Sequence, residues 1–417
     1  MKIRSHYSLV KTLGVAGLMV SSGFFFACSK SNTSANSGPQ LPANAIRSTT
    51  ISGGNVKGTM LADSTYMVNG DVTILKGDTL TVQPGATIKI TGDYAFYVNG
   101  IVQSLGTQAK PITFTTSLAA KPGQWGGFQA DSCQGFTAYW TKFLWAGGPD
   151  ASNPTRQTIG ISVPVPVDIE DCWFVGGQDN GIGIYSTASV RILRNSFYAN
   201  GLGDGDCIDF HSGVTGVVAY NVIWGNAGTA IKVYTSSTIQ NPQTNVEVYN
   251  NTCVDNGFRR GSIEPGRGVL VDAFSQARVY NNLLANNYYS LDITTTADAV
   301  NTKYNNNYFF VSVDSVRQYM YPSFDVGVKQ SGDIINTTTT GANNPMFVGY
   351  NLTPDSSLRN IPSSYDFHLQ SGSPALGKGY TGAVVGLPSW APALSTDIGA
   401  YVSDTSGGKG NRHAAGY

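Results

Sequence analysis

The sequence carries little charge for its length, and the charge it has is balanced. Charged residues make up 12% of the 417 residues, with 26 Lys and Arg against 26 Asp and Glu. A nucleic-acid-binding protein would show a basic stripe or face, so the composition excludes that class of partner. The 41% of hydrophobic residues is too high for a chain that is disordered throughout. We therefore expect a folded protein in which any cluster of charges is informative.

Cysteine and histidine are also scarce. The chain has five Cys and four His, and it contains no Cys-x-x-Cys or Cys/His spacing typical of a zinc site. Three cysteines, Cys172, Cys207 and Cys253, lie among apolar residues, where a free thiol packs as a small hydrophobic group. An exported protein could instead form disulfides, so the redox state of these residues and of Cys133 stays open.

Long apolar runs are absent after the N-terminal region, where a membrane-spanning helix would need ~20 such residues. At the N-terminus, basic residues precede an apolar run over 13–26, and Ala27-Cys28 follows. This arrangement resembles a bacterial lipobox, and a plain secretory signal is the alternative. The resemblance implies removal of residues 1–27, a lipid on Cys28 and a flexible tether over 28–48. The mature protein would then be anchored to the outer membrane or cell surface through this lipid.

What the sequence has in abundance is glycine, asparagine and a repeat. The pattern (Asn/Asp)-x-apolar-apolar-x-(Asn/Gly) recurs at intervals of 24 to 31 residues. Its copies begin at Asp171, Asn195, Asn221, Asn251, Asn282 and, more weakly, Asn306. Units this short, and rich in β-branched residues, Asn and Gly, are not helix pairs. The period predicts an all-β protein, a right-handed parallel β-helix with one coil per repeat.

Each central coil is predicted to contain three short strands. In one coil these strands are 221–224, 230–233 and 246–249, separated by Gly- and Asn-rich turns. Side chains within each strand alternate between the interior and the outside. The repeated asparagines are expected to stack at one turn, where their amides bond to the coils above and below. We assign them a structural role.

The two ends of the chain resemble a known superfamily. Residues 80–90 (LTVQPGATIKI), 110–116 (KPITFTT) and 122–128 (PGQWGGF) are similar to the opening coils of pectate-lyase-like β-helix proteins. Residues 344–347, 366–375 and 397–401 are similar to their closing segment. The resemblance covers roughly 60–401 and implies a β-helix domain over 49–401, followed by a disordered tail over 402–417. It does not define an activity, because the superfamily includes lyases, hydrolases, epimerases and proteins without known catalysis.

One outward-facing row of side chains contains residue types that could take part in catalysis. Aligning the second strand of each coil places one outward residue per coil in a line: Gly183, Asp209, Lys232, Leu270 and Asp292. Coils are about 4.8 Å apart, so Asp209 and Lys232 should be neighbours. His211 shares the parity of Asp209 and is the only histidine in the middle of the predicted solenoid.

Further charges flank this row. An acidic turn with Asp204 and Asp206 precedes the Asp209 strand. The longest interruption of the repeat, 257–267, is the most charged stretch of the mature chain, and Asp272 follows it in the outward register of His211. The charged residues of the interruption are Arg259, Arg260, Glu264 and Arg267.

This inventory matches the needs of a polysaccharide lyase. A cation neutralises the carboxylate of a uronate sugar, and a base then removes the acidified C5 proton. Lys232 or His211 is the candidate base, with Asp209 beside them. Substrate-binding candidates are the charged residues of the interruption and Asp272, and its arginines could clamp a carboxylate through paired hydrogen bonds.

Other readings of the same residues stay open. Asp204 and Asp206, together with Asp209, could hold Ca²⁺ through oxygen ligands. A hydrolase would use paired carboxylates such as Asp206 and Asp209. No complete lyase or hydrolase signature is present. The protein is expected to be a monomer that recognises or processes an extracellular polysaccharide, and the alternative is a non-catalytic adhesin or structural spacer. An active site requires these residues to converge in a groove, whereas a spacer would leave them dispersed.

Aromatic residues form a second candidate surface, since aromatic rings stack on sugar faces. Trp125, Tyr139, Trp140 and Trp145 cluster between the opening coils and the repeat, and Tyr288-Tyr289 lies in the last clear copy. Aromatic residues also fill cores, and we assign Trp125 to the core because it belongs to the structural motif of the superfamily.

Overall fold

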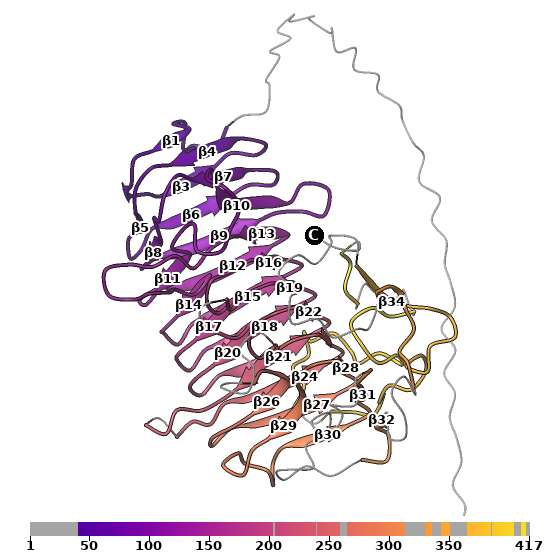
Figure 1. Cartoon of the computed structure of the whole chain (residues 1–417). Helices are drawn as coiled ribbons and strands as arrows, with labels where there is room; N and C mark the ends of the chain where they lie inside the picture. The colour runs from indigo at the N-terminus through magenta and orange to yellow at the C-terminus, as the bar shows by residue number, and fades with distance from the viewer. Residues whose placement is uncertain are drawn as a thin grey trace, which may run out of the picture. The chain divides into compact units, whose positions relative to one another are not determined.

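Short strands with alternating buried and outward residues wind into a coil of three parallel sheets (Figure 1). The computed structural model describes residues 41–202, 205–238, 240–258, 265–312, 330–335, 343–350, 365–384, 386–403 and 410–413. Apart from residue 41, all of them belong to one compact unit, 42–417. The predicted lipidation site Cys28, the signal and most of the tether lie outside the described residues.

Each coil contributes one strand to each sheet, as the three-strand repeat predicted. Sheet 1 contains β1 (Thr50–Ile51), β4 (Thr65–Val68), β7 (Thr87–Ile90), β10 (Ile112–Thr116), β13 (Thr141–Leu144), β16 (Trp173–Val175), β19 (Ser196–Tyr198), β22 (Val222–Trp224), β25 (Thr252–Val254), β28 (Leu283–Ala285), β31 (Tyr308–Phe310) and β32 (Ile334–Ile335). Sheet 2 contains β2 (Gly54–Asn55), β5 (Val72–Ile74), β8 (Phe96–Val98), β11 (Phe128–Ala130), β14 (Ile159–Ile161), β17 (Ile182–Ile184), β20 (Ile208–Phe210), β23 (Ile231–Val233), β26 (Arg267–Val271) and β29 (Tyr289–Ile293). Sheet 3 contains β3 (Gly58–Met60), β6 (Thr79–Val82), β9 (Ile101–Leu105), β12 (Gly135–Tyr139), β15 (Pro166–Glu170), β18 (Ser189–Leu193), β21 (Thr215–Ala219), β24 (Asn245–Tyr249), β27 (Gln276–Tyr280) and β30 (Lys303–Asn305).

The interior of the coil is apolar and is filled by like residues stacked from coil to coil. Phe114, Phe143, Phe174 and Phe197 form such a column, with ring centroids 4.6 to 5.7 Å apart. Trp125 is fully buried beside them, which confirms its assignment to the core. The described cysteines, including Cys207, are also buried, and none of them is in a disulfide. Burial of this apolar column is the main force that holds successive coils together.

The repeated asparagines form the predicted ladder between sheet 3 and sheet 1. From the second member onward, the side-chain oxygen of each residue accepts the backbone N–H and the side-chain N–H of the asparagine one coil earlier, at 2.9 to 3.0 Å. The members are Asn195, Asn221, Asn251, Asn282 and Asn307. A second ladder joins Asn200, Asn226, Asn256 and Asn287. Because the members are fully buried, the amides satisfy backbone groups that the turn would otherwise leave unpaired.

The first and last copies of the repeat were predicted one residue out of register. Asp171 and Asn306 have positive φ, 55° and 53°, and so do Arg194 and Tyr220 before the inner ladder members. This left-handed residue makes the sharp turn from sheet 3 into sheet 1. The ladder position itself falls on Cys172, whose N–H donates to Asn195, and on Asn307. Asp and Asn tolerate the left-handed region better than most residues, which explains why they occur at this position and match the repeat pattern.

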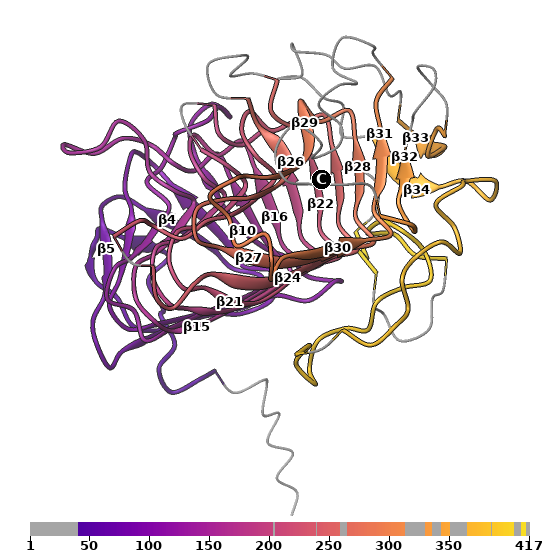
Figure 2. The ribbon, with the colours of Figure 1, turned by 90° about the horizontal axis from the view of Figure 1, so that it is seen from below.

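The C-terminal part returns across the outside of the coil. The antiparallel pair β33 (Phe347–Gly349) and β34 (Asp366–Leu369) follows sheet 1. Seen from below in Figure 2, this pair lies beside β31 and β32, and Phe347 and Phe367 pack in one apolar cluster with Trp224 and Tyr308 of sheet 1. Within the described residues, no helix is long and apolar enough to cross a membrane.

Residues 410–413 differ from the predicted disordered tail over 402–417. His413 is buried, stacks on Trp173 with ring centroids 3.8 Å apart, and shares a hydrogen bond with Ser196 at 2.7 Å. Arg412 pairs with Asp171. The Gly-rich composition favoured disorder. This short polar segment is nevertheless held by stacking on an aromatic residue of sheet 1 and by pairing with the Asp171 carboxylate. Trp140 lies in the same cluster, so it does not form an open sugar-binding surface.

Docking of His413 predicts a pH-dependent stability. Burial lowers the pKa of His413 to about 4, whereas an unfolded histidine titrates near ~6.5. At pH values between these two pKa values, the unfolded chain binds a proton on this histidine and the folded protein does not. The free energy of unfolding therefore falls as the pH falls. We expect a loss of up to about 3 kcal/mol from this residue. Urea unfolding near neutral pH and near the folded pKa should show this loss in the wild type. In His413→Gln, the loss of stability between these two pH values should be smaller by the contribution of His413. A pH dependence equal to that of the wild type would contradict the docking of His413.

Candidate functional site

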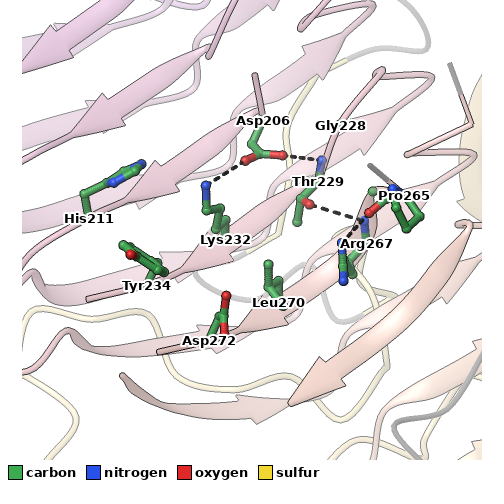
Figure 3. Close-up of a pocket in the computed structure, with 11 residues that line it drawn as sticks. Asp206, His211, Gly228, Thr229, Lys232, Tyr234, Pro265, Arg267, Leu270 and Asp272 are labelled. Atoms are coloured by element: carbon green, nitrogen blue, oxygen red, sulfur yellow. Dashed lines mark hydrogen bonds and ion pairs between the residues drawn. The ribbon is translucent and has the colours of Figure 1, made fainter. Parts of the chain in front are cut away.

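The outward row predicted on sheet 2 is present in the structure. Gly183 pairs in register with Asp209, Asp209 with Lys232, Lys232 with Leu270, and Leu270 with Asp292. A second row, one step further along the strands, carries His211, Tyr234 and Asp272 from consecutive coils. Figure 3 shows side chains from both rows around one cleft. The period-two reading of the strands therefore placed these side chains correctly.

Lys232 is the central cation of the cleft. Its Nζ lies 3.4 Å from a carboxylate oxygen of Asp206 and 3.4 Å from one of Asp209. Burial alone would lower the pKa of Lys232, but the charges of Asp209 and Asp206 outweigh it and raise the pKa above the ordinary value. The ammonium is therefore protonated at neutral pH. Its side chain is 21% exposed, so part of this charge faces the cleft.

His211 and Asp209 form a hydrogen-bonded pair. His211 Nε2 lies 2.7 Å from Asp209 Oδ2, and Asn180 donates to the same oxygen at 3.0 Å. Burial would raise the pKa of Asp209, but the His211 hydrogen bond and the Lys232 charge hold it below the ordinary value. An ionised carboxylate only accepts hydrogen bonds, so Nε2 of a neutral His211 carries the proton. This leaves Nδ1 as the nitrogen that can accept one.

Two tyrosines flank the histidine ring. The ring centroids of Tyr185 and His211 are 4.8 Å apart, and those of His211 and Tyr234 are 5.2 Å apart. Asn180 also donates to the Tyr185 hydroxyl at 3.1 Å. Burial, followed by the nearby carboxylates, raises the pKa of Tyr185. The imidazole is thus held by one carboxylate and two rings, an arrangement that fixes its orientation.

The opposite side of the cleft is formed by the residues after the charged interruption. The cleft has a volume of about 350 Å³ and includes Thr229, Pro265 and Gly266. Arg267 donates to Asp292 at 2.9 Å and lies 5.0 Å above the Tyr289 ring. Asp272 accepts hydrogen bonds from Thr294 and Thr296 at 2.6 and 3.0 Å. One rim therefore carries the Arg267 guanidinium, paired with Asp292, and Asp272 lies on the rim near His211 and Tyr234.

The structure brings together six residues that the sequence singled out. They are Asp206, Asp209, His211, Lys232, Arg267 and Asp272. Four further candidates, Asp204, Arg259, Arg260 and Glu264, lie outside the described residues. Sequence reasoning missed Tyr234, Asn180, Tyr185 and Thr229. Tyr185 and Tyr234 were within reach of the pattern, since they occupy the positions equivalent to His211 one coil earlier and one coil later. Asn180 and Thr229 lie between strands, where the period of the strands carries no signal.

The carboxylates are occupied in a way that does not fit a calcium site. Asp206 accepts the Thr229 N–H at 2.6 Å through one oxygen and faces Lys232 with the other. The Lys232 ammonium lies between Asp206 and Asp209, where a Ca²⁺ shared by them would sit. Among the described residues, no group of three or more His, Cys, Asp or Glu is placed to hold a metal ion. The cation that these carboxylates bind is thus Lys232.

Comparisons with known proteins agree with the fold. A model of the right-handed β-helix region matches residues 153–309, and a model of the pectate-lyase-like β-helix domain matches residues 53–131. The fold is therefore a right-handed β-helix. Among solved structures, the crystal structure of pectate lyase Pel9A is similar at 17% identity and a TM-score of 0.42, over 85% of this chain and 87% of that chain. No curated protein matches the sequence.

Proposed function

We propose that the cleft on sheet 2 binds an extracellular polysaccharide that contains uronate units and cleaves it by β-elimination. The observation that carries the proposal is the convergence of two cations, a histidine–carboxylate pair and a tyrosine around one cleft. A structural spacer would not be expected to bury these charges together, because the transfer of each charge out of water costs free energy. Perturbed ionisable groups that share a cleft are typical of functional sites.

The charges divide the roles between Lys232 and His211. A general base must be unprotonated before it accepts a proton, and two carboxylates hold Lys232 protonated. In the proposed mechanism Lys232 and Arg267 therefore neutralise the uronate carboxylate, which acidifies the C5–H bond. His211 Nδ1 removes that proton while Asp209 holds the ring and stabilises the imidazolium that forms.

The remaining step is expulsion of the leaving group. As the C5–H electrons form the C4–C5 double bond, the C4–O bond breaks and its oxygen takes a proton. The Tyr234 hydroxyl is our candidate donor, since its ring lies beside His211 and lines the cleft. A hydrolase reading of Asp206 and Asp209 is less favoured. A glycosidase general acid needs a raised pKa, and the pKa of Asp209 is lowered.

The test is a substrate screen with the purified protein. Polygalacturonate, alginate and glucuronate-containing glycans would be compared with neutral polysaccharides, and both unsaturated products and new reducing ends would be followed. Unsaturated products from an acidic polysaccharide are expected. New reducing ends without unsaturation would identify a hydrolase and contradict the elimination. Binding of an acidic polysaccharide without either product would mean recognition alone, the role of an adhesin.

A further inference from the structure

A second cleft lies on sheet 3, on a different sheet from the cleft that contains His211. It has a volume of about 210 Å³ and is lined by Ser189, Thr215, Asn245, Glu247, Arg278 and Trp390. The first five side chains come from four consecutive coils, and Trp390 comes from the C-terminal segment that crosses the outside of the sheet. None of these residues belongs to the proposed uronate site.

The floor of this cleft contains hydrogen-bond acceptors without donors. The Glu247 side chain is 3% exposed, and Arg278 contacts it through one carboxylate oxygen, Oε1. The other oxygen, Oε2, has no partner among the described residues, and neither has Asn245 Oδ1 on the same strand. A buried acceptor without a donor costs free energy, because it has lost its hydrogen bonds to water. Donors supplied by a group that enters the cleft would remove this cost.

The wall of the cleft is Trp390, and the segment that carries it is held in place by hydrogen bonds and apolar contacts. The Tyr220 and Tyr249 hydroxyls donate to the carbonyls of Ala393 and Pro392 at 2.5 Å. Leu387, Ala391 and Leu394 pack against the same tyrosines. Trp390 stands between these anchors and remains 38% exposed, with the Arg191 guanidinium 4.6 Å from its ring. Although this segment is held at several points, its largest aromatic ring is not buried and remains at the cleft.

We propose that this cleft binds one neutral sugar unit of a glycan. The apolar C–H face of a pyranose would lie on Trp390, and its hydroxyls would donate to Glu247 Oε2 and Asn245 Oδ1. An apolar platform beside a few convergent polar atoms is the usual composition of a small-molecule site. The ligand is uncharged, because Glu247 and Arg278 already balance each other and the open positions call for O–H donors. Burial raises the pKa of Glu247 despite the opposing charge of Arg278, in keeping with the 3% exposure of its side chain.

This site would hold a glycan without reacting with it. It contains no histidine among its described lining residues, and the Arg278 cation there is paired with Glu247. A polysaccharide with both neutral and acidic units could occupy both sheets, but the sheet 3 site stands independently of the elimination proposed for sheet 2.

The test is native affinity electrophoresis of the full-length protein in gels that contain hydroxyethylcellulose, arabinoxylan free of glucuronate, galactan or mannan. We expect at least one of these neutral polysaccharides to retard the wild type. Trp390→Ala should weaken that binding by roughly tenfold, which corresponds to about 1.4 kcal/mol, because it removes the ring on which the sugar stacks. Tyr97→Ala, which removes a half-buried outward ring from β8 of sheet 2, is the matched control and should bind like the wild type.

Two further variants complete the design. Thr215→Met fills the cleft from an exposed position and should abolish retardation without removing any core contact. His211→Gln should leave retardation unchanged, so a failed elimination and a failed sugar site are distinguishable. The proposal is overturned if none of the four polysaccharides retards the wild type. It is also overturned if Trp390→Ala and Thr215→Met, both shown to be folded by circular dichroism, are retarded as strongly as the wild type.

Discussion

Replacing His211 by glutamine is expected to lower the rate of uronate β-elimination by about 10²- to 10⁴-fold, the usual contribution of a general base. Glutamine can keep a hydrogen bond to Asp209 but cannot accept the C5 proton. The KM for the polysaccharide should change little, because Lys232 and Arg267 bind the carboxylate in the proposed mechanism. The measurement is the initial rate of unsaturated product formation over a range of substrate concentrations.

The chain offers a matched control for this substitution. His368 and Asp366 form another histidine–aspartate pair two residues apart, with Nδ1 2.6 Å from the carboxylate, on β34 rather than sheet 2. His368→Gln should therefore retain the wild-type rate. Equal losses in the two variants would indicate general damage, and an active His211→Gln would remove His211 from the role of base.

The second large effect concerns the asparagine ladder. Asn251→Leu is expected to lower the free energy of unfolding by about 3–5 kcal/mol, because it strands two buried donors of Asn221 at about 1–3 kcal/mol each. It also removes the donor to the Val218 and Tyr249 carbonyls. Leucine has a similar volume, so a cavity contributes little to this loss.

Urea unfolding followed by circular dichroism measures this effect. The control is Asn55→Ala, at an exposed asparagine of β2, which should stay within ~0.5 kcal/mol of the wild type. Hydrogen exchange should speed up first at the backbone N–H of Asn221, whose acceptor has gone. If Asn251→Leu unfolds at the same urea concentration as the wild type, the ladder is not a stabilising element.

Two regular patterns made much of this protein predictable. The spacing of the asparagines defines the coil, and the two-residue period of the strands places Asp209, His211 and Lys232 on one outer face. Register errors arose only at the ends of the ladder. There the left-handed residue at Asp171 and Asn306 resembles a ladder residue in composition, and the local sequence does not show which of the two positions carries the stacked amide.

The features that were not predicted depend on contacts that the repeat pattern does not encode. Trp390 meets Asn245 and Glu247 only because the C-terminal segment folds back over sheet 3. His413 reaches Ser196 in the same way, across 217 positions of sequence. The proposed division of roles between Lys232 and His211 was also open from the sequence. It rests on Asp209 and Asp206 together, and Asp206 approaches the ammonium from a turn rather than from a strand.

The central claim is that the cleft on sheet 2 takes a uronate through its carboxylate. The most direct measurement is calorimetric binding of oligogalacturonate and of its methyl ester, which differs only in the neutralised carboxylates. The wild type should bind the acid more tightly than the ester. Lys232→Met should lose that preference, whereas Lys89→Met, at an exposed lysine of β7, should keep it. Equal binding of acid and ester by the wild type, or a preference that survives in Lys232→Met, would contradict the account.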